Sequence, residues 1–243
     1  FQKGTKYEGI FKNKTIFFSH HLFNDEKRFS IETSLFYNKS INAYSKESLI
    51  TDNLSFEKYL LSSGNTNLNG SFSVINYFRI LKTATKIETI QNWNETPTMV
   101  NSNAFVNIKT YSSSYKFSAT TYFNLPINLD FGFNYNYYQA DLNSIITKNT
   151  IKDAFVNVNY DISETWIGEL NSTFYYMNSK NYSFVNAVLS YNPEKSRFSY
   201  RLVLNNLKNE NEFTLVSLDN YTSYKSSLNL VPRYLLLTVK YRF

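Results

Sequence analysis

The sequence predicts an all-β fold, a transmembrane antiparallel up-and-down β-barrel, on three observations. Polar and apolar residues alternate with period two in many segments, the pattern of a strand with one apolar face. These segments run for about ten to thirteen residues, the length that crosses a bilayer when a strand is tilted by about 45°. Short and long connections alternate between them, as when tight turns gather at one membrane face and loops at the other.

The individual strands follow from this alternation. Leu129, Phe131 and Phe133 alternate with Asp130 and Gly132, and the last segment, 231–243, alternates in the same way. The alternation is weakest in 53–78 and 84–94. The predicted strands, about eleven in number, are 14–23, 28–39, 53–61 running on through 66–78, 84–94, 104–123, 128–140, 153–161, 165–177, 182–191, 198–206 and 231–243.

Two kinds of connection separate these strands. Short turns are predicted at 24–27, 125–128, 161–164 and 192–195, and longer polar loops at 39–52, 95–103, 141–150 and 207–230. With eleven strands, the first and the last run in the same direction, whereas bacterial barrels keep both termini on the periplasmic side. Either residues 1–13 hold one more strand or the chain is the tail of a longer barrel, and we favour the tail.

Composition narrows the class further. The mean hydropathy of −0.38 resembles that of a soluble protein, but a barrel that alternates lipid-facing and lumen-facing residues averages the same way. A soluble β-sandwich is the competing fold, and its strands would be about five or six residues long. Aromatic residues make up 18% of the chain, and many tyrosines fall at predicted strand ends, where a membrane barrel has its aromatic girdles. We therefore expect one domain, 1–243, in the bacterial outer membrane.

Other classes are excluded on composition and pattern. No stretch is long and apolar enough for a membrane helix, and the absence of cysteine excludes disulfides and thiolate metal sites. The net charge of +6 comes from scattered lysines and arginines rather than a basic patch, so no nucleic-acid partner is expected. His20 and His21 are adjacent on a strand and point to opposite faces, so they do not chelate one ion. No nucleophile with a base is recognisable, and we predict no enzyme activity and no cofactor.

The end of the chain carries the most specific motifs. Asn206-Leu207-Lys208-Asn209 follows the penultimate strand, Leu230-Val231-Pro232-Arg233 enters the last one, and the chain closes on Tyr241-Arg242-Phe243. These motifs resemble the C-terminal end of TonB-dependent outer-membrane receptors of the Bacteroidetes type, although Lys208 stands where that family usually has Phe. The resemblance implies a 22-stranded barrel of which this chain is the C-terminal half. It also implies a plug domain, which is not present in these residues, and TonB as a partner.

Candidate functional residues follow from the predicted barrel. Ionisable side chains expected on the inner face are Arg28, Glu32, Lys116, Asp130, Glu169 and Arg201. The alternative to a binding role is that these side chains only face water in a lumen or pair with side chains of neighbouring strands. Aromatic residues of the longest loop, Phe213, Tyr221 and Tyr224, are candidates for binding a ligand or partner. Tyr241 and Phe243 are the residues that, by the resemblance, the barrel-assembly machinery reads.

The sequence is compatible with three functions. The first is the barrel of a TonB-dependent receptor that takes up a bulky nutrient, embedded in outer-membrane lipid. The second is a structural scaffold in an outer-membrane complex, with a surface lipoprotein or another outer-membrane protein as partner. The third is a small self-contained porin, which would need an even number of strands.

Overall fold

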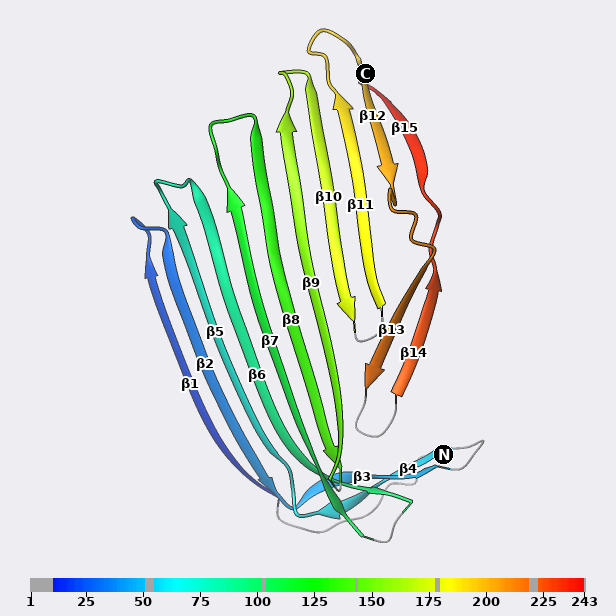
Figure 1. Ribbon diagram of the computed structural model, residues 1–243. Coiled ribbons are helices and arrows are strands. Elements are labelled where there is room, and N and C mark those ends of the chain that lie inside the picture. The colour runs from blue at the N-terminus through cyan, green and yellow to red at the C-terminus, as the bar shows by residue number, and fades with distance from the viewer. Residues whose placement is uncertain are drawn as a thin grey trace.

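The structure, a computed structural model, describes residues 11–50, 55–101, 104–142, 144–177, 180–218 and 223–242. Among these residues, none belongs to a helix that is long and apolar enough to span a membrane. Figure 1 shows one curved sheet in which eleven strands lie side by side. In chain order they are β1 (Lys12–Asn24), β2 (Phe29–Ile41), β5 (Thr66–Phe78), β6 (Thr83–Val100), β7 (Val106–Thr121), β8 (Ile127–Leu142), β9 (Ile145–Asp161), β10 (Trp166–Met177), β11 (Lys180–Tyr191), β12 (Phe198–Asn205) and β15 (Tyr234–Tyr241).

The eleven strands have up-and-down topology. Each is antiparallel to its neighbours, in the order β1-β2-β5-β6-β7-β8-β9-β10-β11-β12-β15. Short turns at 25–28, 79–82, 122–126, 162–165 and 192–197 all lie at one end of the sheet, where β15 also ends (Figure 1). We call this the turn end. The antiparallel, all-β architecture predicted from the sequence is confirmed. About eleven strands were predicted for the chain; eleven follow this path, and the described residues hold four more.

The opposite end, which we call the hairpin end, carries two additional hairpins. β3 (Ala43–Ile50) pairs with β4 (Ser55–Ser62) and makes two parallel pairs with β6 near Met99. β13 (Glu212–Leu218) pairs with β14 (Ser223–Asn229). The predicted loops 39–52 and 207–230 are therefore wrong as irregular segments, since both contain strands. Each segment forms a hairpin of its own. The second strand of the first hairpin, β4, lies after the predicted loop 39–52.

One predicted strand is two. Segment 53–78 was expected to run on without interruption, but it contains β4 and β5 with a break between Ser62 and Thr66. Gly64 at this break has a φ of +97°, and a Cβ added there would lie 1.9 Å from the backbone oxygen of Ser40. The chain turns there because only glycine fits this backbone conformation and this close approach.

Two other predicted loops are largely strand. β6 continues to Val100 through the predicted loop 95–103, and only 143–144 separates β8 from β9 inside the predicted loop 141–150. Both predictions were wrong because the backbone ladder continues through segments in which polar and apolar residues no longer alternate, as at Met99-Val100 and Ile145-Ile146. Without this alternation the sequence does not indicate a strand.

The register gives the sheet two chemically different faces. Directly opposed residues of antiparallel strands carry side chains on the same face. One row across β1 to β9 contains Leu22, Ile31, Val74, Ile87, Phe117, Phe133 and Ala154. The adjacent row, on the other face, contains His21, Glu32, Ser73, Glu88, Lys116, Asn134 and Asp153. We call these the apolar face and the polar face.

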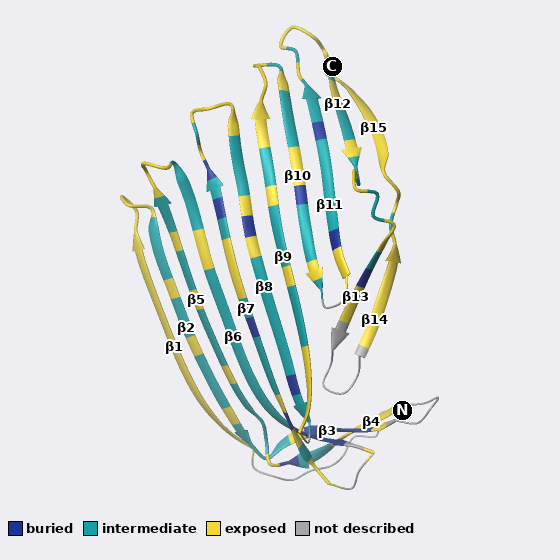
Figure 2. Ribbon diagram, viewed as in Figure 1, coloured by how far each residue is buried: buried dark blue, intermediate teal, exposed yellow. Residues whose placement is uncertain are grey.

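The apolar face has no second protein layer over it in the part of the chain that the structure describes. Phe133 in the middle of β8 is 42% exposed and Leu237 in β15 is 61% exposed. A water-soluble domain buries such a face against another element. Figure 2 shows β1 and β15, the two edges of the sheet, exposed along their whole lengths.

Candidate functional site

The polar face carries the ionisable side chains that the sequence predicted to point inward. By register, Glu32, Lys116, Asp130, Glu169 and Arg201 all lie on it. Most of them interact across strands. Lys116 Nζ lies 3.1 Å from Glu88 Oε1, and Arg201 Nη2 lies 3.9 Å from Glu169 Oε2. Exposed pairs of this kind contribute only about 0–1 kcal/mol each, so they balance charge on the face more than they hold the sheet together.

Asp130, Glu32 and Arg28 are held in different ways. Asp130 Oδ1 accepts a hydrogen bond from Thr120 Oγ1 at 3.0 Å, and Glu32 lies 3.7 Å from His21 Nε2. Arg28 is in the turn before β2, with a φ of +48°, and its guanidinium lies 5.1 Å from the ring centroid of Tyr77. The structure thus places Arg28 at the turn end, away from the rows of charge on the strands.

The β13–β14 hairpin folds onto the polar face, and Phe213 attaches it there. Its ring centroid lies 5.5 Å from that of Tyr175, 4.9 Å from Tyr182 and 5.6 Å from Phe184. All three rings belong to the polar face of β10 and β11. Phe213 is therefore half-buried in an aromatic cluster. Tyr224, by contrast, is 61% exposed, and Tyr221 lies outside the described residues.

Hydrogen bonds fix the hairpin along the same face. The Thr214 backbone N–H donates to Tyr182 Oη at 3.0 Å, and Asn149 Nδ2 donates to the Val216 carbonyl at 3.2 Å. Glu212 Oε2 lies 3.5 Å from Lys180 Nζ. Hydrogen bonds from the Ser227 and Thr214 hydroxyls, together with the Lys180 ammonium, lower the pKa of Glu212. The hairpin carboxylate is thus held in its charged form.

The base of the hairpin is clamped by the two asparagines of the Asn206-Leu207-Lys208-Asn209 motif. Both have left-handed backbones, with φ of +52° and +56°, a region that asparagine tolerates better than most residues. Asn206 Nδ2 donates to the Glu210 carbonyl at 2.8 Å and to the Val231 carbonyl at 2.9 Å, and Asn209 Oδ1 accepts from the Arg233 N–H at 3.0 Å. Lys208 is exposed in this turn.

At the end of the chain, Tyr241 packs on the neighbouring strand. Its ring centroid lies 5.0 Å from that of Phe198, and Arg197 Nη1 donates to its hydroxyl at 3.1 Å. Phe243 lies outside the described residues.

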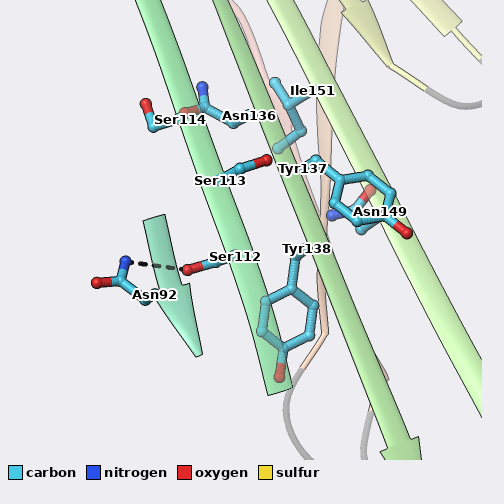
Figure 3. A pocket seen from close by; sticks show the side chains of 9 residues that line it. All are labelled: Asn92, Ser112, Ser113, Ser114, Asn136, Tyr137, Tyr138, Asn149 and Ile151. Atoms are coloured by element: carbon cyan, nitrogen blue, oxygen red, sulfur yellow. Dashed lines mark hydrogen bonds between the residues drawn. The ribbon is translucent and has the colours of Figure 1, made fainter. Parts of the chain in front are cut away.

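A hollow of about 230 Å³ lies on β6 to β9 and is lined by uncharged side chains (Figure 3). Asn92 Nδ2 donates to Ser112 Oγ at 3.1 Å within it, as the dashed line shows. Ser114 Oγ, also in its lining, is buried and has no hydrogen-bond partner among the described residues. Amide and hydroxyl groups of this kind suit a neutral polar ligand, because each donates and accepts hydrogen bonds without a charge.

A second hollow, of about 190 Å³, lies beneath the β13–β14 hairpin. It shares Asn149 and Ile151 with the first, so the two are contiguous. Lys180 and Lys225 bring positive charge to it. The hydroxyl and amide groups of the first hollow therefore adjoin a second hollow under the hairpin. One lysine of that second hollow, Lys180, belongs to β11, and the other, Lys225, belongs to β14.

The sequence did not single out the residues of these hollows. A serine run and isolated asparagines look the same whether they line a ligand site or are merely solvated. The described residues contain no group of three or more side chains suited to hold a metal ion. Comparison of the sequence with protein-family models and with curated proteins finds no match. The fold and the geometry of the polar face are thus the basis for any functional assignment.

Proposed function

We propose that this chain is the C-terminal part of the barrel of a TonB-dependent outer-membrane receptor, which takes up a bulky nutrient. The observation that carries the proposal is a single-layer sheet of eleven antiparallel strands with an uncovered apolar face and two unpaired edges. The polar face then belongs to the lumen, and the β13–β14 hairpin narrows that lumen from the hairpin end.

Strand length and surface chemistry support a membrane location. β2 and β5 each have 13 residues and β7 has 16, whereas a tilted strand needs about 9–11 to cross a bilayer. Aliphatic and aromatic side chains exposed across a whole sheet face are stable in lipid and costly in water. The extra length lies at the hairpin end, where β6, β8 and β9 extend into polar sequence.

The edges favour part of a larger barrel over a self-contained porin. β1 pairs only with β2, and β15 only with β12, among the described residues. Because β1 and β15 are the first and last of eleven antiparallel strands, they run in the same direction, and joining them would create one parallel pair. Open edges do not persist in hydrocarbon. An all-antiparallel barrel therefore requires an odd number of further strands beyond those described.

The assignment to TonB-dependent receptors rests on the motifs at the end of the chain. Asn206 and Asn209 form the clamp between the hairpin and the entry to β15, a structural reason for asparagine at both positions. A structural scaffold is the second candidate. It is favoured by the ion pairs on the polar face, which leave those charges engaged with one another.

The test is the natural polypeptide that carries this sequence, isolated from the membrane of the cells that make it. We expect an intact mass well above 28.5 kDa, a plug-like region and further strands ahead of Phe1, and cross-linking to TonB in energised cells. A barrel of that kind with no cross-link to TonB, but with a partner in fixed ratio, would favour the scaffold. An intact mass near 28.5 kDa in a protein that forms closed channels by itself would overturn both.

A further inference from the structure

The turn between β5 and β6 exposes two large aliphatic side chains. Ile80 is 97% exposed and Leu81 is 61% exposed. The turn is tight, with the Lys82 N–H donating to the Arg79 carbonyl at 3.3 Å. Turn positions are usually filled by Gly, Pro, Asn, Asp or Ser, each for a conformational reason. Turn geometry thus gives no reason for isoleucine and leucine here, and their exposure needs another explanation.

Two hollows flank these side chains, and both continue the apolar face at the turn end. One, of about 540 Å³, is lined by Phe78 together with the turn itself. The other, of about 680 Å³, is lined by Leu125, Leu129 and Phe131 on the neighbouring hairpin. By register, Phe78, Leu129 and Phe131 belong to the apolar face. Each hollow is therefore an open, mostly apolar depression that Ile80 and Leu81 help to line.

Positive charge lies in the lining of each hollow. Lys27 and Arg79 line the first hollow and Lys82 lines the second, and no acidic side chain lines either. The Arg79 guanidinium donates to the Glu26 carbonyl, which connects this turn to the one between β1 and β2. Lysine side chains extend along apolar surface and keep their ammonium groups at its polar boundary. Mostly apolar hollows lined by cations suit a lipid with a negatively charged headgroup.

We propose that this part of the turn end is a binding site for an anionic phospholipid. The acyl chains lie in the two hollows on either side of Ile80 and Leu81, and the headgroup phosphate binds Lys27, Arg79 and Lys82. The proposal rests on the proposed function in one respect, since it needs the apolar face to lie in a bilayer. It adds a preferred lipid at a defined place on that face.

The experiment uses the natural full-length polypeptide in vesicles of phosphatidylcholine with a small fraction of phosphatidylglycerol. After extraction in mild detergent, native mass spectrometry measures the ratio of the two lipids that remain bound. We expect phosphatidylglycerol to be enriched at least fivefold over the vesicle, and the double variant Lys27→Gln/Lys82→Gln to return to the vesicle ratio. Arg79 is left intact because it links two turns. Ile80→Asn/Leu81→Asn should reduce the total lipid retained.

The matched control is Lys195→Gln/Lys240→Gln, which removes two lysines at the same end of the sheet but away from both hollows. It should keep the enrichment. Retention of the two lipids in the vesicle ratio by the unaltered protein, or the same loss of enrichment in both lysine pairs, would overturn the proposal. Insertion into the vesicles, judged by resistance to carbonate extraction, is scored separately. Failure to insert contradicts the proposed function, whereas insertion without enrichment contradicts only the lipid site.

Discussion

At the scale of single residues, the close approach of neighbouring strands decides which substitutions the sheet accepts. Gly132 in β8 is buried, and a Cβ added there would lie 2.5 Å from the Phe117 backbone oxygen and 2.6 Å from the Phe155 ring. Gly70 in β5 is different, because the nearest atom to an added Cβ is Leu35 Cδ1 at 3.9 Å. The two glycines look alike in the sequence and differ only in their neighbours.

Gly132→Ala should therefore lower the free energy of unfolding by about 1–3 kcal/mol, because the Phe155 ring and the strand backbone must move apart. Gly70→Ala should raise the same quantity by about 0.5 kcal/mol, since alanine loses less conformational entropy on folding. Denaturant unfolding from vesicles, followed by tryptophan fluorescence, measures both. Equal effects of the two substitutions would refute the packing described at Gly132.

Glu212 gives the hairpin a defined pH dependence. Its pKa in the folded protein lies below the ordinary value of 4.5, so its contacts stabilise the hairpin at neutral pH and are lost as pH falls through the lowered pKa. The distance between spin labels at Ser226 and Asn181 should stay constant from neutral pH down to 4.5 and broaden below it. The Glu212→Gln variant should lack this transition. A transition centred near neutral pH would rule out Glu212 as its cause.

At the scale of elements, period two located the strands that lie within the sheet but not the segments beyond it. β8 was recognised through Phe131 and Phe133, whereas its continuation into β9 was taken for a loop because polar and apolar residues are mixed on both faces there, as at Leu142 and Ile146. The hairpin on the polar face was also unpredictable, since Phe213 finds its aromatic partners on β10 and β11 through tertiary packing. Of the candidate site residues, the sequence found the charges of the polar face and missed the uncharged hollows.

An added charge should destabilise the protein much more on the apolar face than on the polar face of the same strand. Phe133→Arg in β8 should destabilise the inserted protein by about 2–4 kcal/mol, because it puts a charge among lipid chains. Asn134→Arg, one residue along on the polar face, should cost much less. Unfolding midpoints in vesicles give both values. If both arginines are tolerated equally, the apolar face does not contact lipid.

Phe213 is the side chain through which the β13–β14 hairpin packs against the aromatic residues of the sheet. Phe213→Ala should weaken the docking of the hairpin by about 2 kcal/mol, less than the 3–5 of a fully buried phenylalanine, because Phe213 is only half-buried. The rate of amide hydrogen exchange in the peptide 207–218 should therefore rise. Tyr224→Ala, an exposed aromatic in the same hairpin, is the control and should leave exchange unchanged. An unaltered rate in the Phe213 variant would mean that the aromatic cluster does not hold the hairpin.

At the scale of the whole molecule, the account depends on one sheet that separates lipid from a polar interior and is completed by other strands. The edge strands β1 and β15 run in the same direction, so the sheet does not close on itself as an antiparallel barrel. If the chain spans a membrane as we propose, the polar face, with its contiguous hollows and its fixed hairpin, is one wall of the interior. The turn end, with its exposed aliphatic residues and lysines, then lies at the boundary of the membrane.

The most direct measurement is a scan of spin labels along β8 from Phe131 to Tyr137, one position at a time and without Gly132, in the natural full-length polypeptide reconstituted into vesicles. Collision with oxygen, which concentrates in lipid, should peak at Phe131, Phe133 and Tyr135. Collision with a water-soluble nickel chelate should peak at Asn134 and Asn136. That period of two, in opposite phase for the two reagents, is the result a membrane-spanning sheet predicts. High chelate accessibility at every position, without alternation, would contradict the account.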